Sequence, residues 1–263
     1  MPLKTALVAA VVAALVTAAT LLVIWRAAPV VVDAPGAALD EKRIVDIVHN
    51  YLTKNPEILV EMTTELDKRQ QTEQAEQQEM VISENADAIF RSPRSYSAGN
   101  PDGDVSVVEF FDYNCGFCRR ALPDVVKLID TDDKVRVVFK ELPIFGEESE
   151  DAAKGALAAG KQGKYFEMHQ KLYSEPGKAN KEKALKIAQQ LELDVPQFES
   201  DMASAEVQQT LDEARDIAQK LGLQGTPFYL IGDRSVPGAP DDLYDQLAAK
   251  VAEVRQEGCK AKC

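Results

Sequence analysis

The sequence predicts an α/β fold, and three observations from one part of the chain support that prediction. Residues 105–111 (VSVVEFF) are apolar and rich in β-branched side chains, which is typical of a buried strand. Cys115 and Cys118 follow, and residues 119–130 favour a helix. Residues 134–139 (KVRVVF) form the next predicted strand. The order strand, helix, strand is a βαβ unit, and a Cys-X-X-Cys pair inside such a unit indicates redox chemistry.

The elements after this unit enlarge it into one domain, residues 93–257. Apolar residues at helical spacing predict several helices over about 147–222, which form a helical subdomain inserted between two strands. Strands are expected again at 226–231 and 235–236, and residues 241–256 favour a closing helix.

The composition limits the classes of function. The chain has 263 residues, of which 45% are hydrophobic and 28% are charged, as is ordinary for a globular protein. Its formal net charge is -13. Binding of nucleic-acid phosphates requires a basic surface, so we expect no nucleic-acid partner.

The two cysteines stand where disulfide exchange would need them. A thiolate is the nucleophile of that reaction, and the free N–H groups and dipole at a helix start favour an anion. Cys115 stands at the predicted helix start, and Cys118 lies one turn further on and deeper. We therefore expect Cys115 to form the mixed disulfide with a substrate and Cys118 to resolve it.

Two other roles for this cysteine pair remain open. One is a structural disulfide. The other is a metal site: zinc usually requires four ligands, and no second pair at suitable spacing is present, but Cu(I) can be held by two thiolates. His49 and His169 are too scattered for a histidine-rich site. We expect no metal or other cofactor and keep copper binding or copper chaperoning as the alternative function.

Thr226 and Pro227 open the strand that follows the helical subdomain. A proline at this position is often a fixed turn, sometimes with a cis peptide bond. A cis bond would turn backbone groups of Thr226 towards the cysteines, where an extended substrate could pair with them. An ordinary turn proline is the alternative.

The N-terminal part predicts export. Residues 5–25 are apolar, and at about 1.5 Å per residue they reach about 30 Å, the thickness of a membrane core. Residues 1–28 are therefore an uncleaved anchor or a cleaved signal peptide. Both place the rest of the chain outside the cytoplasm, and we expect a bacterial periplasm, where thiols can be kept oxidised. An anchor would tether the protein to the inner membrane.

A linker and a helical arm occupy residues 29–92. Apolar residues recur at helical spacing, with a break at Asn55-Pro56. Leu52, Leu59 and Leu66 are seven residues apart, which suggests a homo-oligomer formed through residues 38–92. A spacer, or an arm packed back on the domain, is the alternative.

Three segments of the chain resemble the DsbA family of periplasmic thiol–disulfide oxidoreductases, which have a thioredoxin fold. The segments are VVEFFDYNCGFC, VVFKELPIFGEES and GTPFYLIG, in this order. The resemblance covers residues 93–257, and it implies a thioredoxin fold with the inserted helical subdomain. The arm, residues 38–92, is similar to the ScsC-like branch, in which some members oligomerise and isomerise disulfides.

The resemblance also implies roles for single residues. Cys115 corresponds to the nucleophile and Cys118 to its partner, while Thr226 and Pro227 correspond to a substrate-binding cis-proline loop. Glu109 matches a buried acid beneath the active site, where a raised pKa would let it relay protons for Cys118.

Further expectations concern partners and direction. We considered Lys140 as a partner for Glu109. The family implies protein thiol or disulfide substrates and a membrane redox partner. Strongly oxidising members carry Pro-His between the cysteines, whereas this chain carries Gly116 and Phe117. Oxidase and isomerase activity therefore both remain open.

Two more cysteines, Cys259 and Cys263, lie in a tail at residues 258–263, outside the resemblance. They could close a small disulfide loop, act as a terminal redox relay or metal clip, or have no defined role.

Overall fold

A computed structural model describes residues 41–259 of the chain. The expected anchor or signal segment at 5–25 and Cys263 lie outside the described residues. Within 41–259, no helix is both long and apolar enough to cross a membrane. The chain divides into two compact units, Met1–Leu66 and Asp67–Cys263, and each is considered by itself.

The first unit contains α2 (Glu41–Lys54) and the beginning of α3 (Glu57–Glu84). The two helices are separated at Asn55 and Pro56, as predicted, because proline cannot continue the preceding helix. None of the residues of α2 is buried. Large apolar side chains are instead exposed along this unit, at Ile44, Val45, Ile47, Val48, Tyr51, Leu59, Val60, Met62 and Leu66.

The second unit is built on a five-stranded sheet with the order β1-β3-β2-β4-β5. Its strands are β1 (Ser97–Gly99), β2 (Val105–Phe111), β3 (Val135–Glu141), β4 (Phe228–Ile231) and β5 (Arg234–Pro237). β2 and β3 run parallel, as the predicted βαβ unit requires, and the other neighbours are antiparallel. The short edge strand β1 was not expected from the sequence.

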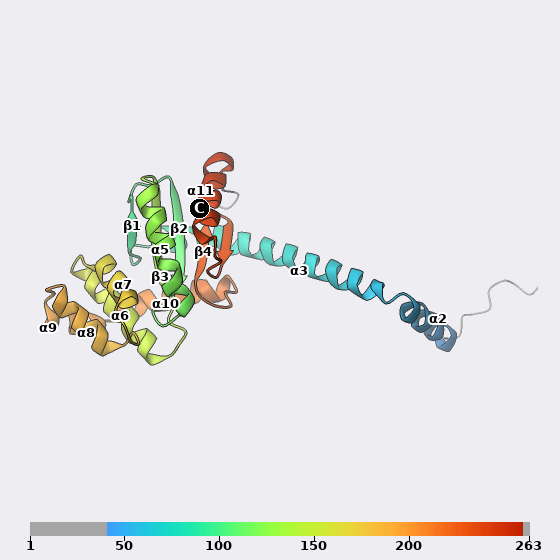
Figure 1. Cartoon of the computed structure of the whole chain (residues 1–263), viewed down its shortest axis with the longest axis horizontal. Helices are drawn as coiled ribbons and strands as arrows, with labels where there is room; N and C mark the ends of the chain where they lie inside the picture. Colours follow the sequence, from blue (N-terminus) through green and yellow to red (C-terminus); the bar gives the residue numbers. More distant parts are fainter. Residues whose placement is uncertain (1–40, 260–263) are drawn as a thin grey trace, which may run out of the picture. The chain divides into compact units, whose positions relative to one another are not determined.

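Helices cover both faces of the sheet (Figure 1). They are α4 (Ala86–Phe90), α5 (Gly116–Thr131), α10 (Ala205–Lys220) and α11 (Leu243–Glu257). Val105 and Val107 of β2 belong to the core shared with α5 and α11, whereas Val108 and Phe110 belong to the core shared with α4 and α10. Successive side chains of a strand point to opposite faces, so β2 is buried on both.

The inserted helical subdomain runs from α6 to α10, close to the predicted span of 147–222. Its other helices are α6 (Glu147–Lys161), α7 (Tyr165–Ser174), α8 (Lys181–Gln190) and α9 (Val195–Met202). Gly155 allows α6 and α8 to approach closely, because a Cβ there would lie 2.6 Å from the Cβ of Ala184. Gly222, with a φ of +67°, follows the end of α10.

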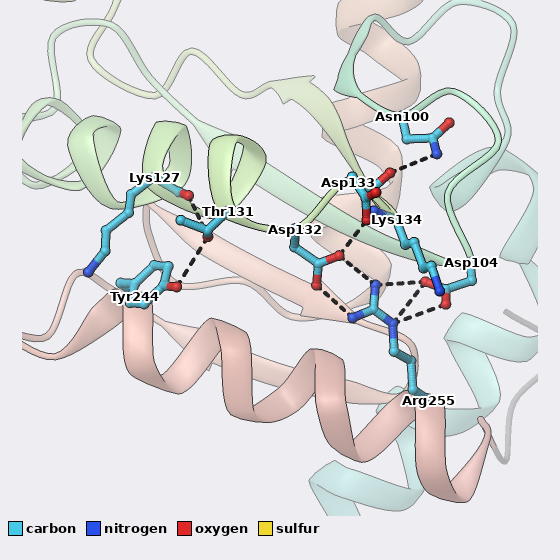
Figure 2. A network of polar contacts seen from close by, with 9 residues as sticks. All are labelled: Asn100, Asp104, Lys127, Thr131, Asp132, Asp133, Lys134, Tyr244 and Arg255. Atoms are coloured by element: carbon cyan, nitrogen blue, oxygen red, sulfur yellow. Dashed lines mark hydrogen bonds and ion pairs between the residues drawn. The ribbon is translucent and has the colours of Figure 1, made fainter.

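A polar network holds the end of α11 to the sheet (Figure 2). The Arg255 guanidinium donates to Asp104, just before β2, and to Asp132, just after α5, at 2.6–3.0 Å. Asn100 donates to the backbone oxygen of Asp133 at 2.8 Å. These contacts join three segments that are distant in the sequence.

Candidate active site

The end of β2 and the start of α5 place the two cysteines. Cys115 is the N-cap residue of α5, and Cys118 lies in its first turn. The Cys115 N–H donates to the Asp112 carbonyl at 3.1 Å, and the Arg119 N–H donates to the Cys115 carbonyl at 3.1 Å. Both cysteines are buried free thiols. The structure therefore places Cys115 at a helix start, as the sequence predicted.

The pKa values of the two thiols are shifted in opposite directions. The hydrogen bond from the Cys118 thiol is the largest cause that lowers the pKa of Cys115, to about 5, and the backbone N–H groups of Phe117 and Cys118 add to it while burial opposes it. Burial, followed by the hydrogen bond to Cys115, raises the pKa of Cys118 far above its usual range. Near neutral pH, Cys115 is therefore a thiolate, and Cys118 keeps its proton.

The Thr226–Pro227 peptide bond is cis, one of the two forms that the sequence left open. The carbonyl oxygen of Thr226 lies 3.3 Å from Cys115 Sγ, within hydrogen-bonding distance of the thiol. The Pro227 carbonyl in turn accepts a 2.8 Å hydrogen bond from the Gly238 N–H. This loop thus presents backbone groups beside the sulfur, as expected for a cis bond at this position.

Glu109 lies in the middle of β2 and is buried. Burial raises its pKa to about 7, although a hydrogen bond donated by the Tyr229 hydroxyl at 3.0 Å acts in the opposite direction. The negative charge on Glu109 also contributes to the raised pKa of Cys118, so the two groups are electrostatically coupled. A carboxyl group with this pKa can exchange a proton near neutral pH.

The idea that Lys140 pairs with Glu109 is wrong. Glu109 is paired in register with Phe139 on β3, so Lys140, the next residue, points to the opposite face of the sheet. There Lys140 Nζ lies 3.1 Å from a carboxylate oxygen of Glu213 and donates to the Ala88 carbonyl.

Asp112 is a buried residue of the site that the sequence analysis did not single out. Its Oδ1 accepts hydrogen bonds from the Asn114 N–H at 2.6 Å and the Ser149 hydroxyl at 2.8 Å. Its Oδ2 accepts from the N–H groups of Ile144 at 2.7 Å and Phe145 at 3.1 Å. The carboxylate therefore fixes the loop after β3 to the segment that carries Cys115. The available sequence signal was a local one, since Asp commonly accepts from the N–H two residues on in a turn.

Three large apolar side chains are exposed in these two segments. Phe117 is 60% exposed, Ile144 47% and Phe145 53%. Phe117 stands between the cysteines, and the backbone of the other two is held by Asp112. Exposed apolar groups at a site are typical of a surface that contacts another protein.

His169 is buried among aromatic rings in the core of the second unit. Burial lowers its pKa to about 3, so the ring is neutral. Its Nδ1 lies 3.1 Å from the Tyr113 hydroxyl, which donates to the buried carboxyl group of Glu141 at 3.2 Å. Within 41–259, no group of three or more histidine, cysteine or acidic side chains is placed to hold a metal ion.

In the tail, Cys259 is disulfide-bonded. It therefore differs from Cys115 and Cys118, which are free thiols.

Comparison with known families gives two matches. Residues 106–252 match the DSBA-like thioredoxin domain, and residues 40–73 match the copper resistance protein ScsC N-terminal domain. The first match covers more than half of the chain and includes the βαβ unit, the inserted helices and the cis-proline loop.

Solved structures of similar proteins agree with this match. A thioredoxin-like oxidoreductase from Silicibacter pomeroyi DSS-3 is 45% identical, with a TM-score of 0.63 over 65% of this chain and 98% of its own. The thiol-disulfide exchange protein alpha-DsbA2 from Wolbachia pipientis is 32% identical, with a TM-score of 0.63 over 68% and 97%. A linker-deletion mutant of Proteus mirabilis ScsC is 29% identical, with a TM-score of 0.62 over 86% and 99%.

Curated relatives include proteins of two kinds. A probable disulfide bond formation protein D from Bacillus cereus is 29% identical over 163 residues, 57% of this chain and 76% of its own. The Na(+)/H(+) antiporter NhaA 1 of Salinispora arenicola is 30% identical over 148 residues, 56% of this chain and 23% of its own. The chain thus spans less than a quarter of the length of that antiporter.

The predicted thioredoxin fold with an inserted helical subdomain is therefore confirmed. The Cys-X-X-Cys pair at the start of α5 and the cis-proline loop opposite it lie inside the matched region. The chain belongs to the DSBA-like thioredoxin domain family of thiol–disulfide oxidoreductases.

Proposed function

We propose that the protein exchanges disulfides with exported proteins through Cys115 and Cys118. The observation that carries this proposal is the geometry of the pair: Cys115 caps the start of α5 with its Sγ 3.3 Å from the Thr226 carbonyl, and Cys118 lies buried in the first turn behind it. In this setting the pKa of Cys115 is lowered and the pKa of Cys118 is raised. A nucleophile and a resolving thiol need these two states.

The exchange proceeds in two steps that balance. In the reducing direction, the Cys115 thiolate attacks a substrate disulfide, forms a mixed disulfide and releases one substrate thiolate. Cys118 then loses its proton and attacks Cys115 Sγ, which releases the second substrate thiolate and leaves a Cys115–Cys118 disulfide. Two electrons pass to the substrate, and the oxidising direction is the exact reverse.

We assign Glu109 as the group that accepts the proton when the Cys118 thiol is deprotonated. The acid is buried, electrostatically coupled to Cys118, and has a pKa of about 7. Thr226 and Pro227 take the substrate, because an extended chain beside Cys115 can pair with the backbone of Thr226.

The arm is proposed to form a homo-oligomer. Its support is the row of exposed apolar side chains on α2 and on the beginning of α3, together with the match to the ScsC N-terminal domain. Several subunits facing a shared space would suit isomerisation of misfolded clients. A single oxidised site that a membrane partner re-oxidises would suit an oxidase.

The proposed location is a bacterial periplasm, with residues 5–25 as the export signal or the tether to the inner membrane. One similar structure, 27% identical over 64% of this chain, is described as a periplasmic thioredoxin-like protein from Salmonella enterica serovar Typhimurium. An oxidising compartment is also where a dithiol pair of this kind can be recycled.

Binding of Cu(I) by the two thiols is the second candidate. Its support is the description of the matching N-terminal domain as one from a copper resistance protein. Two soft thiolates can hold Cu(I), but this would require Cys118 to lose its proton against a strongly raised pKa.

Reduction of a model protein disulfide tests the main proposal. The wild-type chain is expected to catalyse it, Cys115→Ala to abolish it, and Cys118→Ala to accumulate a mixed disulfide at Cys115. Activity that survives Cys115→Ala would refute the proposal. The redox state in the cell then separates the directions, because a largely oxidised pair indicates an oxidase and a largely reduced pair an isomerase.

A further inference from the structure

Arg120 lies in the second turn of α5, just behind the two cysteines, and its guanidinium makes two contacts. It lies over the ring of Phe117, with the guanidinium carbon 5.1 Å from the ring centroid. It also donates a hydrogen bond to the backbone carbonyl of Ala239, a buried residue that follows β5. One side chain therefore joins the helix that carries the cysteines to the segment between β5 and α11.

The segment after β5 holds the cis-proline loop. Gly238 has a φ of +74°, in the left-handed region that favours glycine, and its N–H donates the 2.8 Å hydrogen bond to the Pro227 carbonyl. Ala239, the next residue, presents the carbonyl that Arg120 binds. Among residues 41–259, Arg120 supplies the only hydrogen bond to that carbonyl. The guanidinium is thus one peptide unit away from the group that fixes the loop.

The contacts of Arg120 reach both sides of the reactive sulfur. The Thr226 carbonyl lies 3.3 Å from Cys115 Sγ on one side, and the backbone N–H of Phe117 helps to stabilise the thiolate on the other. Apart from the contact of Cys115 with Thr226, the bond from Arg120 is the only hydrogen bond among residues 41–259 that joins the start of α5 to the chain from the cis-proline loop to α11.

This role depends on position more than on charge. The charge of Arg120 is not among the main causes that lower the pKa of Cys115. A guanidinium is planar, so it can stack on an aromatic ring and donate to a carbonyl at the same time. We infer that Arg120 is a positioning residue for disulfide exchange, which holds the cis-proline loop and the start of α5 at their working distance. The inference rests on the proposed function and adds to it a residue outside the Cys-X-X-Cys motif.

The test compares Arg120→Met with Arg119→Met in the full chain. Methionine keeps an apolar stem and removes the charge and every donor. Arg119 is the matched control, because it is the neighbouring residue of α5, is exposed, and forms no side-chain hydrogen bond or ion pair with the residues between 41 and 259. Both variants lose one positive charge close to Cys115, so a difference between them reports position. Thermal unfolding verifies that each variant is folded.

Two reactions of Cys115 are followed as the pH is varied. Alkylation by iodoacetamide requires only the thiolate, whereas attack on a peptide disulfide also requires the cis-proline loop. In Arg120→Met, the midpoint of alkylation should rise by about half a pH unit to one unit, because the N–H of Phe117 is held less firmly. Where the thiol is fully ionised, alkylation should be as fast as in the wild type, but the peptide reaction should be about tenfold slower. Arg119→Met should match the wild type in both reactions.

Equal rates of the peptide reaction in Arg120→Met and Arg119→Met would overturn the inference and leave disulfide exchange intact, whether both match the wild type or both are slowed by the lost charge. A wild type that does not attack the peptide disulfide would refute the proposed function itself.

Discussion

Glu109 and Tyr229 face each other across the pairing of β2 with β4, and the Tyr229 hydroxyl donates a 3.0 Å hydrogen bond to Glu109 Oε1. This is the hydrogen bond that opposes the effect of burial on the acid. The hydrogen bond lowers the pKa by less than burial raises it, so the pKa of Glu109 remains near 7.

The raised pKa of Glu109 makes stability depend on pH. Between 4.5, the usual pKa, and about 7, the unfolded chain loses this proton while the folded protein keeps it. The free energy of unfolding therefore falls over this window, by roughly 3 kcal/mol in total for this group, and levels off at about pH 8. Glu109→Gln removes the effect, so the variant should gain stability over the wild type at pH 8 but not at pH 4. Urea unfolding at both pH values checks this, and an equal difference at both would contradict it.

The same substitution should slow the step in which Cys118 attacks. Glutamine cannot take the proton, and a lost general base typically costs 10²- to 10⁴-fold. Rapid mixing with a peptide disulfide separates the steps: formation of the mixed disulfide should be nearly unchanged, and its resolution slow. Tyr229→Phe is the control, since it removes the hydrogen bond but keeps the carboxyl group. Equal resolution rates in Glu109→Gln and wild type would exclude the relay.

Cys115 should react as a thiolate down to mildly acidic pH. Because the pKa of this thiol is lowered to about 5, the rate of its alkylation should be flat above pH 6 and fall below pH 5. Cys118 should remain unreactive across this range, because its pKa is strongly raised. Mass spectrometry after a pulse of iodoacetamide at each pH measures both sites. A midpoint near pH 9 for Cys115 would contradict the geometry of the pair.

Much of this fold follows from the local sequence, and the exceptions have physical causes. The strand at 105–111 and the inserted helices were predictable because each element carries its own apolar period. β1 was not, since Ser97–Gly99 has no such pattern and its pairing is decided by β3. The end of the inserted subdomain, in contrast, was predictable from Gly222, because glycine commonly follows the end of a helix.

The site divides in the same way. Cys115, Cys118 and the cis-proline loop follow from short motifs. The role of Asp112 depends on backbone donors more than thirty residues away, and the partner of Lys140 depends on which face of β3 it occupies. Contacts of this kind are set by tertiary structure, and no local pattern encodes them.

The exposed apolar row of α2 predicts self-association. Ile44→Lys/Val48→Lys places two charges on one face of the helix, and a charge buried between subunits without a partner is costly. The wild type should be larger than a monomer in analytical ultracentrifugation, and the variant should dissociate. The control variant Asn50→Lys/Thr53→Lys adds the same charge at polar positions of α2, and it should remain an oligomer. A monomeric wild type would contradict the oligomer.

Arg255 should stabilise the second unit through its geometry as well as its charge. Its planar guanidinium donates two hydrogen bonds to Asp132 and three to Asp104, a paired geometry that the compact ammonium group of lysine does not reproduce (Figure 2). Arg255→Lys should cost about 1 kcal/mol, or about 2–4 °C in Tm, because the network is partly exposed. Arg215→Lys, at a more exposed pair, should change Tm by less. Equal effects in the two variants would mean that the fork of hydrogen bonds is unimportant.

Asp112 is predicted to couple the loop after β3 to the segment that carries Cys115. Asp112→Ala leaves three backbone N–H groups and the Ser149 hydroxyl without their acceptor, which should cost about 3 kcal/mol or more. Asp112→Asn keeps one oxygen but turns an NH₂ group towards donors, so it should lose somewhat less stability than Asp112→Ala. Asp130→Asn, an exposed position on α5, is the control.

The measurement specific to this coupling is amide hydrogen exchange at Ile144 and Phe145. Both N–H groups donate to Asp112 Oδ2, so their exchange should accelerate in Asp112→Asn beyond any global loss of stability. Once the loop is released, its exposed apolar side chains are no longer held beside Cys115, and KM for a protein disulfide should rise more than KM for oxidised glutathione. Unchanged protection at Ile144 and Phe145 would show that the loop is held by other contacts.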